Sequence, residues 1–169
     1  MVPTKEELFQ QVYEAPSDDG RRRVLADHLL QEGDPRGELI MLQFDTSARA
    51  RKRADKLLER HRQAFLEPLR PVVVPGTDAW ERGFLVACSA RLDGGLAGCP
   101  AWATVRRLGV ALTSGRPTEL ASRWMASLQD VFVAQPTRFP PDAAGWQHMH
   151  ALVEDVLRSV GREGLLRRR

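Results

Sequence analysis

The residue types that most often carry chemistry are few in this sequence and poorly spaced for it. His148 and His150 lie two positions apart in a segment with helical periodicity. On a helix, side chains at that spacing point about 200° apart, so they cannot share a metal ion as an i, i+4 pair could. Gly94 and Gly95 lack the Lys-Ser/Thr that follows in a phosphate-binding loop. We therefore predict that the protein is not an enzyme and has no catalytic residues, metal or cofactor.

The two cysteines also lie in positions that do not favour a chemical role. Cys88 lies in an apolar run typical of a strand, and Cys99 precedes Pro100. This favours two buried free thiols over a disulfide or a metal role.

The first residues lack the apolar segment of a secretion signal, and no apolar run approaches the ~20 residues of a membrane span. We predict a cytoplasmic protein that does not enter a membrane.

Basic side chains form a stripe with spacing suited to binding. The chain has 25 Lys and Arg residues against 22 Asp and Glu residues, for a net charge of +3. Arg49, Arg53, Lys56 and Arg60 recur every three or four positions within an expected helix over 47–69, so they share a face. This face could contact a protein partner or the phosphates of a nucleic acid. The alternative is an ordinary solvated helix surface.

Three shorter helices are expected before this basic helix. Thr4 and Glu7 have the spacing of a capping box. Residues 17–19 offer N-cap oxygens to a second helix. Asp34 followed by Pro35 is typical of a helix start. The third helix is apolar around most of its circumference, so we expect it to pack in a core rather than to read DNA as the second helix of a helix-turn-helix.

Four tryptophans lie at intervals of 22 residues in the second half of the chain: Trp80, Trp102, Trp124 and Trp146. An apolar L-x-x-L-x-L-like pattern recurs there at a period of 23 residues. Repeats of ~20–29 residues with this pattern are typical of leucine-rich repeats, in which each unit adds one strand to a parallel sheet. We predict strands over 83–90, 105–112 and 128–134, joined by crossovers and followed by a helix over 142–160.

These elements predict a mixed α/β fold in three parts. The parts are a helical domain over 1–70, a short leucine-rich-repeat-like domain over 78–161 and a basic, frayed tail over 162–169. The predicted sheet is parallel, with crossover segments and a C-terminal helix.

The faces of the predicted sheet can also be compared. Aligning Leu85, Leu108 and Val131 places the intervening residues on the outward face. Two of the three resulting columns are apolar or small, and one of them ends in Phe132. An open apolar face normally marks an interface. We expect the C-terminal helix to cover this face at least in part, with a partner protein as the alternative.

Residues 16–43 resemble a bacterial family. Its pattern is D-D-x-x-R, then A-D-W-L-E-E, then G-D-P-R-G-E-F-I-x-L-Q. The chain matches at Asp18, Asp19, Arg22 or Arg23, Ala26, Asp27, Leu29, Glu32, Gly33, Asp34, Pro35, Arg36, Gly37, Glu38, Ile40, Leu42 and Gln43. This stretch is similar to the uncharacterised repeat-companion domain, an N-terminal module often followed by leucine-rich repeats. The resemblance implies a repeat region downstream and no activity. We expect Asp27 and Arg36 to brace the turn at 33–35.

These patterns together predict a non-catalytic protein–protein interaction or adaptor module. The expected partner is another protein, and no oligomeric state is indicated. The alternative is a nucleic-acid-binding accessory protein that uses the basic helix over 47–70 and the Arg-rich tail.

Overall fold

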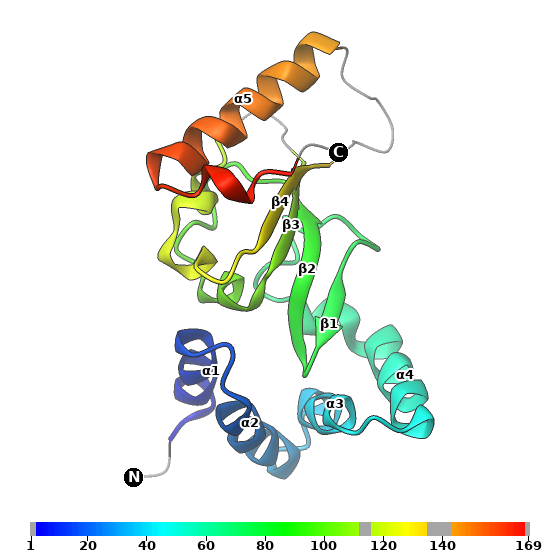
Figure 1. Cartoon of the computed structure of the whole chain (residues 1–169). Coiled ribbons are helices and arrows are strands. Elements are labelled where there is room, and N and C mark those ends of the chain that lie inside the picture. Colours follow the sequence, from blue (N-terminus) through cyan, green and yellow to red (C-terminus); the bar gives the residue numbers. More distant parts are fainter. Residues whose placement is uncertain (1–2, 112–115, 135–142, 168–169) are drawn as a thin grey trace. The chain divides into compact units, whose positions relative to one another are not determined.

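The computed structural model describes residues 3–111, 116–134 and 143–167 (Figure 1). Within these ranges the chain has five α-helices and a four-stranded sheet, which confirms the predicted mixed α/β class. The chain divides into two compact units. The first unit comprises Met1–Arg70 with Trp80–Leu85, and the second comprises Pro71–Ala79 with Val86–Arg169.

Helices make up most of the first unit: α1 (Lys5–Glu14), α2 (Asp19–Gln31), α3 (Pro35–Phe44) and α4 (Ala48–Phe65). Each begins at a side-chain cap, supplied in turn by Thr4, Asp18, Asp34 and Ser47. Such caps accept hydrogen bonds from main-chain N–H groups that the first helical turn leaves without partners. Helix α4 ends before the predicted residue 69. Pro68 accounts for this, because it has no N–H and disfavours helical geometry in the residue before it.

The core of the first unit is apolar and closely packed. Its buried members are Leu8, Val12, Leu25, Ala26, Leu29, Ile40 and Phe84. Helices α2 and α3 approach so closely at Gly37 that an added Cβ would lie 2.8 Å from the carbonyl oxygen of Ala26. Leu39 and Ile40 of α3 are fully buried, so this helix packs inside the unit, as its composition predicts.

A β-hairpin that the sequence did not predict places its turn and adjoining residues, Trp80–Leu85, in the first unit. Strand β1 (Ala79–Glu81) turns through Arg82 and Gly83 into β2 (Phe84–Ala90). Both turn residues have positive φ, 50° and 77°, as two-residue turns in hairpins require. Because Trp80–Leu85 pack with the helices, the second unit differs from the predicted domain over 78–161 in its first residues.

The second unit is built on a parallel sheet. Strands β2, β3 (Arg107–Val110) and β4 (Asp130–Val133) pair in parallel, and the strand order is β1-β2-β3-β4 (Figure 1). Parallel neighbours need a crossover connection. Short 3₁₀ helices provide part of it: η1 (Pro100–Thr104), η2 (Thr118–Ala121) and η3 (Arg123–Met125).

The register of the sheet agrees with the prediction at one pair of strands and differs at the other. Leu108 lies opposite Val131, as the 23-residue period predicts. On the other side of β3, however, Leu108 lies opposite Cys88 and not Leu85. The predicted alignment of β2 is therefore wrong by three residues. The outward column that contains Phe132 is completed by Gly109 and Ser89.

The repeated unit has the 23-residue period of the apolar pattern and not the 22-residue period of the tryptophans. The N–H of Trp102 donates to the carbonyl of Cys99, and the N–H of Met125 donates to the carbonyl of Ser122, 23 residues further on in each case. Trp102 and Met125 are both fully buried. The expected equivalence of Trp102 and Trp124 is therefore wrong, and Trp124 is only half-buried.

After β4 the chain returns to the sheet through α5 (Ala143–Ser159) and η4 (Glu163–Leu165). Leu166 then forms a parallel bridge with Val131, and the N–H of Arg167 donates to the Val131 carbonyl over 2.7 Å. The predicted frayed tail is thus ordered as far as Arg167, and residues 168–169 lie outside the described part. Helix α5 contacts the crossover segment η2 as well as β4, so it packs on the crossover side.

Candidate functional site

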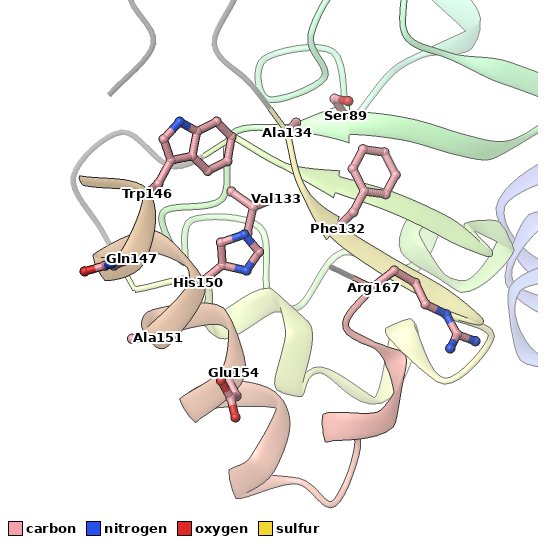
Figure 2. A pocket seen from close by; sticks show the side chains of 10 residues that line it. All are labelled: Ser89, Phe132, Val133, Ala134, Trp146, Gln147, His150, Ala151, Glu154 and Arg167. Carbon is pink, nitrogen blue, oxygen red and sulfur yellow. The ribbon is translucent and has the colours of Figure 1, made fainter. Parts of the chain in front are cut away.

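A hollow of about 980 Å³ opens in the second unit between strand β4 and helix α5 (Figure 2). Its lining comes from both elements, with one residue each from β2 and the C-terminal segment: Ser89, Phe132, Val133, Ala134, Trp146, Gln147, His150, Ala151, Glu154 and Arg167. This volume lies in the range of ordinary ligand and peptide pockets. The sequence predicted none of these residues as a site, although it placed Phe132 on the outward face.

The β4 wall is fixed by close packing across the sheet. Phe132 and Ser89 flank Gly109 in the outward column, and a Cβ added to Gly109 would lie 2.5 Å from Ser89 Oγ and 2.8 Å from the Phe132 ring. Only glycine therefore leaves room for both neighbours. Phe132 and Ser89 are half-buried and line the hollow together with residues of α5, so the C-terminal helix does not cover this face completely.

The α5 wall carries an aromatic pair. Trp146 and His150 lie one helical turn apart, with ring centroids separated by 6.1 Å, and Figure 2 shows both projecting on the side that faces β4. His148 is exposed, so the two histidines lie on different sides of the helix, as their spacing predicts. Within the described ranges, no three His, Cys, Asp or Glu side chains are grouped to hold a metal ion.

The charged side chains at the rim of the hollow are neutralised by neighbours. Arg167 Nε donates to Asp130 Oδ1 over 2.8 Å, and Arg158 donates to Glu154 over 2.7 Å. The Arg167 side chain is 61 % exposed. A rim of paired charges around apolar and aromatic walls does not select strongly for the charge of a ligand.

Strand β4, whose Val133 lines the hollow, forms the outer edge of the sheet. The N–H groups of Asp130 and Ala134 donate to carbonyls of Arg106 and Val110, so even-numbered residues of β4 face β3. Val131 faces the outer edge and is bonded there by Arg167. Val133 faces the same way, and nothing in the described ranges bonds its N–H or C=O.

The thiols are unsuited to nucleophilic chemistry. Cys88 and Cys99 are buried and free, as predicted. Burial, with a smaller contribution from the Asp78 carboxylate, raises the pKa of Cys88 to about 12. Burial also raises the pKa of Cys99. Both groups therefore remain thiols at neutral pH, whereas a reactive cysteine needs an accessible thiolate.

The predicted basic stripe lies on α4 in the first unit, and Arg49, Arg53, Lys56 and Arg60 are all exposed. The last three line a second hollow, of about 680 Å³, together with Glu38, Leu57 and Glu59. Glu38 forms an ion pair with Arg53. Two carboxylates therefore reduce the positive charge that three of the four predicted residues share.

The residues of the recognised motif act inside the first unit. Arg36 does not brace the turn at 33–35. Its guanidinium donates to the Phe65 carbonyl and lies within 5.8 Å of the ring centres of Phe9, Phe65 and Phe84. Burial lowers its pKa, although the charge is favoured by the three ring faces. Asp27 is exposed.

Gln43, the last residue of that motif, binds the hairpin. Its side-chain oxygen accepts a hydrogen bond from the Gly83 N–H over 2.7 Å, and its side-chain nitrogen donates to the Trp80 carbonyl. Gly83 rests against Ile40 so closely that an added Cβ would lie 2.3 Å from Ile40 Cγ1. The motif thus holds the hairpin turn against α3.

No helix in the described ranges is long and apolar enough to cross a membrane. No family model, curated protein or solved structure matches the chain.

Proposed function

We propose that the protein is a non-catalytic protein–protein interaction module and that the hollow between β4 and α5 is its binding site. The observation that carries the proposal is the lining of this hollow. Phe132, Trp146 and His150 surround a site of about 980 Å³, and aromatic residues are enriched where proteins bind other proteins. The paired charges of the rim favour a protein partner over a polyanion.

Two further parts of the proposal concern the architecture. The second unit is a shortened leucine-rich-repeat-like array, which the 23-residue recurrence of hydrogen bonds and buried residues supports. The first unit is a repeat-companion-like domain, supported by the motif residues that hold the hairpin. We also propose a cytoplasmic location, which two free buried cysteines favour.

Site-specific photo-crosslinking tests the proposed site. A benzoylphenylalanine side chain replaces Ala151, which is exposed at the hollow, or Gln31, which is exposed on α2 as the matched control. Irradiation in cells should join a defined protein to the Ala151 variant and not to the Gln31 variant. Trp146→Ala in the same background should remove that product. Identical products at both positions would contradict the proposed site.

A nucleic-acid-binding accessory protein is the second candidate. It is favoured by the gathering of Arg53, Lys56 and Arg60 around the hollow on α4. Binding through phosphates weakens steeply as salt rises, because each neutralised phosphate releases counterions. Affinity for a labelled DNA or RNA duplex should therefore fall steeply from low to high salt and fall further in Lys56→Glu. Equal affinity across the salt series would reject this candidate.

A further inference from the structure

We infer that the hollow binds its partner as an extended peptide segment that adds to the outer edge of β4 at Val133, where nothing in the described ranges bonds the main chain. This inference rests on the proposed function and names the kind of partner that the site accepts. It is carried by the main chain exposed at the edge, by the neighbouring pairing of Leu166 and by the opposing wall of α5.

The first step concerns the main chain at the edge. Residues of β4 alternate between β3 and the outer edge, and Val131 and Val133 face outward. Val131 is bonded by Arg167 over 2.7 Å. A strand edge with an unused donor and acceptor is a template for pairing with another chain. Val133 is also one of the residues that line the hollow.

The second step concerns what can satisfy that edge. An extended peptide donates and accepts main-chain hydrogen bonds along its length, and strand addition is a common way in which proteins bind peptides. A helix has already used its main-chain groups internally, so it would leave Val133 unbonded. The parallel bridge between Val131 and Leu166 shows that this edge accommodates a strand.

The third step concerns the side chains of the peptide. In a strand, alternate side chains point to opposite sides, so every second residue of the added segment would face α5. There it meets Trp146 and His150, whose rings are 6.1 Å apart. Because Arg167 and Glu154 already have ionic partners, the segment needs apolar or aromatic side chains more than charged ones.

A peptide library displayed on phage, with random segments of about a dozen residues, provides the probe. The full chain is the target, and Val133→Pro and Val133→Thr are the paired variants. Proline removes the N–H that faces the edge, and an edge position tolerates it because no bond within the sheet is lost. Threonine has a similar shape and keeps the N–H.

The inference predicts that selected peptides bind the wild-type chain and Val133→Thr alike, and bind Val133→Pro at least tenfold more weakly. Methylation of alternate main-chain nitrogens in the peptide should also weaken binding at least tenfold. Circular dichroism checks that both variants are folded. Binding that is indifferent to proline and to methylation would overturn strand addition, while the crosslinks at position 151 could still support a binding site of another kind.

Two other outcomes also overturn the inference. One is the absence of any selected peptide that binds the wild-type chain. The other is selection of peptides only by a chain shortened to Arg167, because the edge would then be closed to peptides in the full chain.

Discussion

The two units of the molecule differ in how they use polar groups. In the first unit, Arg36 is buried against three aromatic rings, and Gln43 bonds both sides of the hairpin turn. In the second unit, Leu108 of β3 pairs with Val131 of β4, 23 residues further on, and the main-chain groups of half-buried Val133 face the outer edge of β4 with no bonding partner in the described ranges. The clearest contrast is therefore between specifically bonded side chains in the first unit and unbonded main-chain groups at the described sheet edge of the second.

This difference predicts which substitutions should affect stability and which should affect binding. Buried polar groups with specific partners fix one arrangement, because each lost partner leaves a desolvated group. A parallel sheet built from similar units ends in an edge strand, and the outer main-chain groups of that strand have no partner within the sheet. We therefore expect substitutions in the first unit to act mainly on stability, and substitutions at the β4 edge mainly on binding.

The largest effect is expected at Arg36. Replacing Arg36 by Ala removes the side chain that three rings surround and leaves the buried Phe65 carbonyl without its donor. Removal of a large buried side chain and of a hydrogen bond together should lower the free energy of unfolding by about 4 kcal/mol. Urea unfolding followed by circular dichroism measures the loss.

The matched control is Arg49→Ala, because Arg49 is exposed on α4. It should change stability by less than about 0.5 kcal/mol. Equal unfolding midpoints for the Arg36 and Arg49 variants would show that the buried Arg36 guanidinium does not contribute more to stability than an exposed arginine.

The hairpin turn offers the next test. Gly83 and Gly33 both have positive φ, 77° and 72°, but only Gly83 has a neighbour in the space of its missing Cβ. Gly33→Ala should cost about 1 kcal/mol from backbone strain alone. Gly83→Ala should cost about 3 kcal/mol, because the new methyl group also displaces Ile40. Similar losses in thermal melts would show that the turn does not rest against α3.

A smaller effect is expected in the sheet of the second unit. Gly109→Ala places a methyl group between Ser89 and Phe132, at an expected cost of about 2 kcal/mol. Because the clash is with those two side chains, adding Phe132→Ala should restore part of the loss. A double-mutant cycle measures this coupling, and strictly additive losses would contradict the packing of the β4 wall.

The smallest effect concerns the ion pair at the start of α3. Lys5 Nζ lies 2.5 Å from Asp34 Oδ2. The hydrogen bond to Asp34 raises the pKa of Lys5 above 10.5. Partial burial acts to raise the pKa of Asp34, but the bonds and charges of Lys5 and Arg36 together lower it below 3.8. The pair should stabilise the fold by about 0.5 kcal/mol, since both groups are partly exposed.

The pH dependence of that contribution follows from the two directions. The Asp34 contribution is present above pH 3.8 and is lost as pH falls through its lowered pKa in the folded protein. The Lys5 contribution is complete below pH 10.5 and is lost as pH rises through its raised pKa. The stability difference between wild type and Lys5→Met should therefore be constant near neutrality and shrink at both extremes. A difference that changes near neutral pH would contradict this pairing.

Local signals in the sequence predicted most of the fold. Helix caps at Thr4, Asp18 and Asp34 depend on neighbours a few residues away, so they can be read directly. The pairing of Leu108 with Val131 follows from a period that two consecutive units share. The position of β2 could not be read in this way, because the unit that links β2 to β3 is three residues shorter than the next.

The tryptophan spacing shows how a regular pattern can mislead. The four tryptophans recur at intervals of 22 residues, whereas the segments around η1 and η3 correspond at an interval of 23 residues, so Trp124 lies one position before the equivalent of Trp102. Trp102 is buried in η1, but Met125 and not Trp124 occupies the equivalent position in η3. The two units therefore share a buried apolar position, although a different residue type occupies it in each.

The candidate site could be predicted only in part. The outward position of Phe132 follows from strand alternation. The approach of Trp146 and His150 to β4 depends on how α5 returns the chain to the sheet, and that return is fixed by the distant pairing of Leu166 with Val131. Glu38 next to the basic stripe was also missed, because it comes from another helix.

Amide hydrogen exchange at two adjacent residues tests the central claim most directly. In the free protein, the N–H of Ala134 is bonded to the Val110 carbonyl over 2.9 Å, whereas the N–H of Val133 faces the outer edge of β4 and has no acceptor within the described ranges. We expect the Val133 amide to exchange far faster than that of Ala134 and to become protected when a selected peptide is added. Equal protection of both amides in the free protein would contradict the open edge on which the account of the second unit depends.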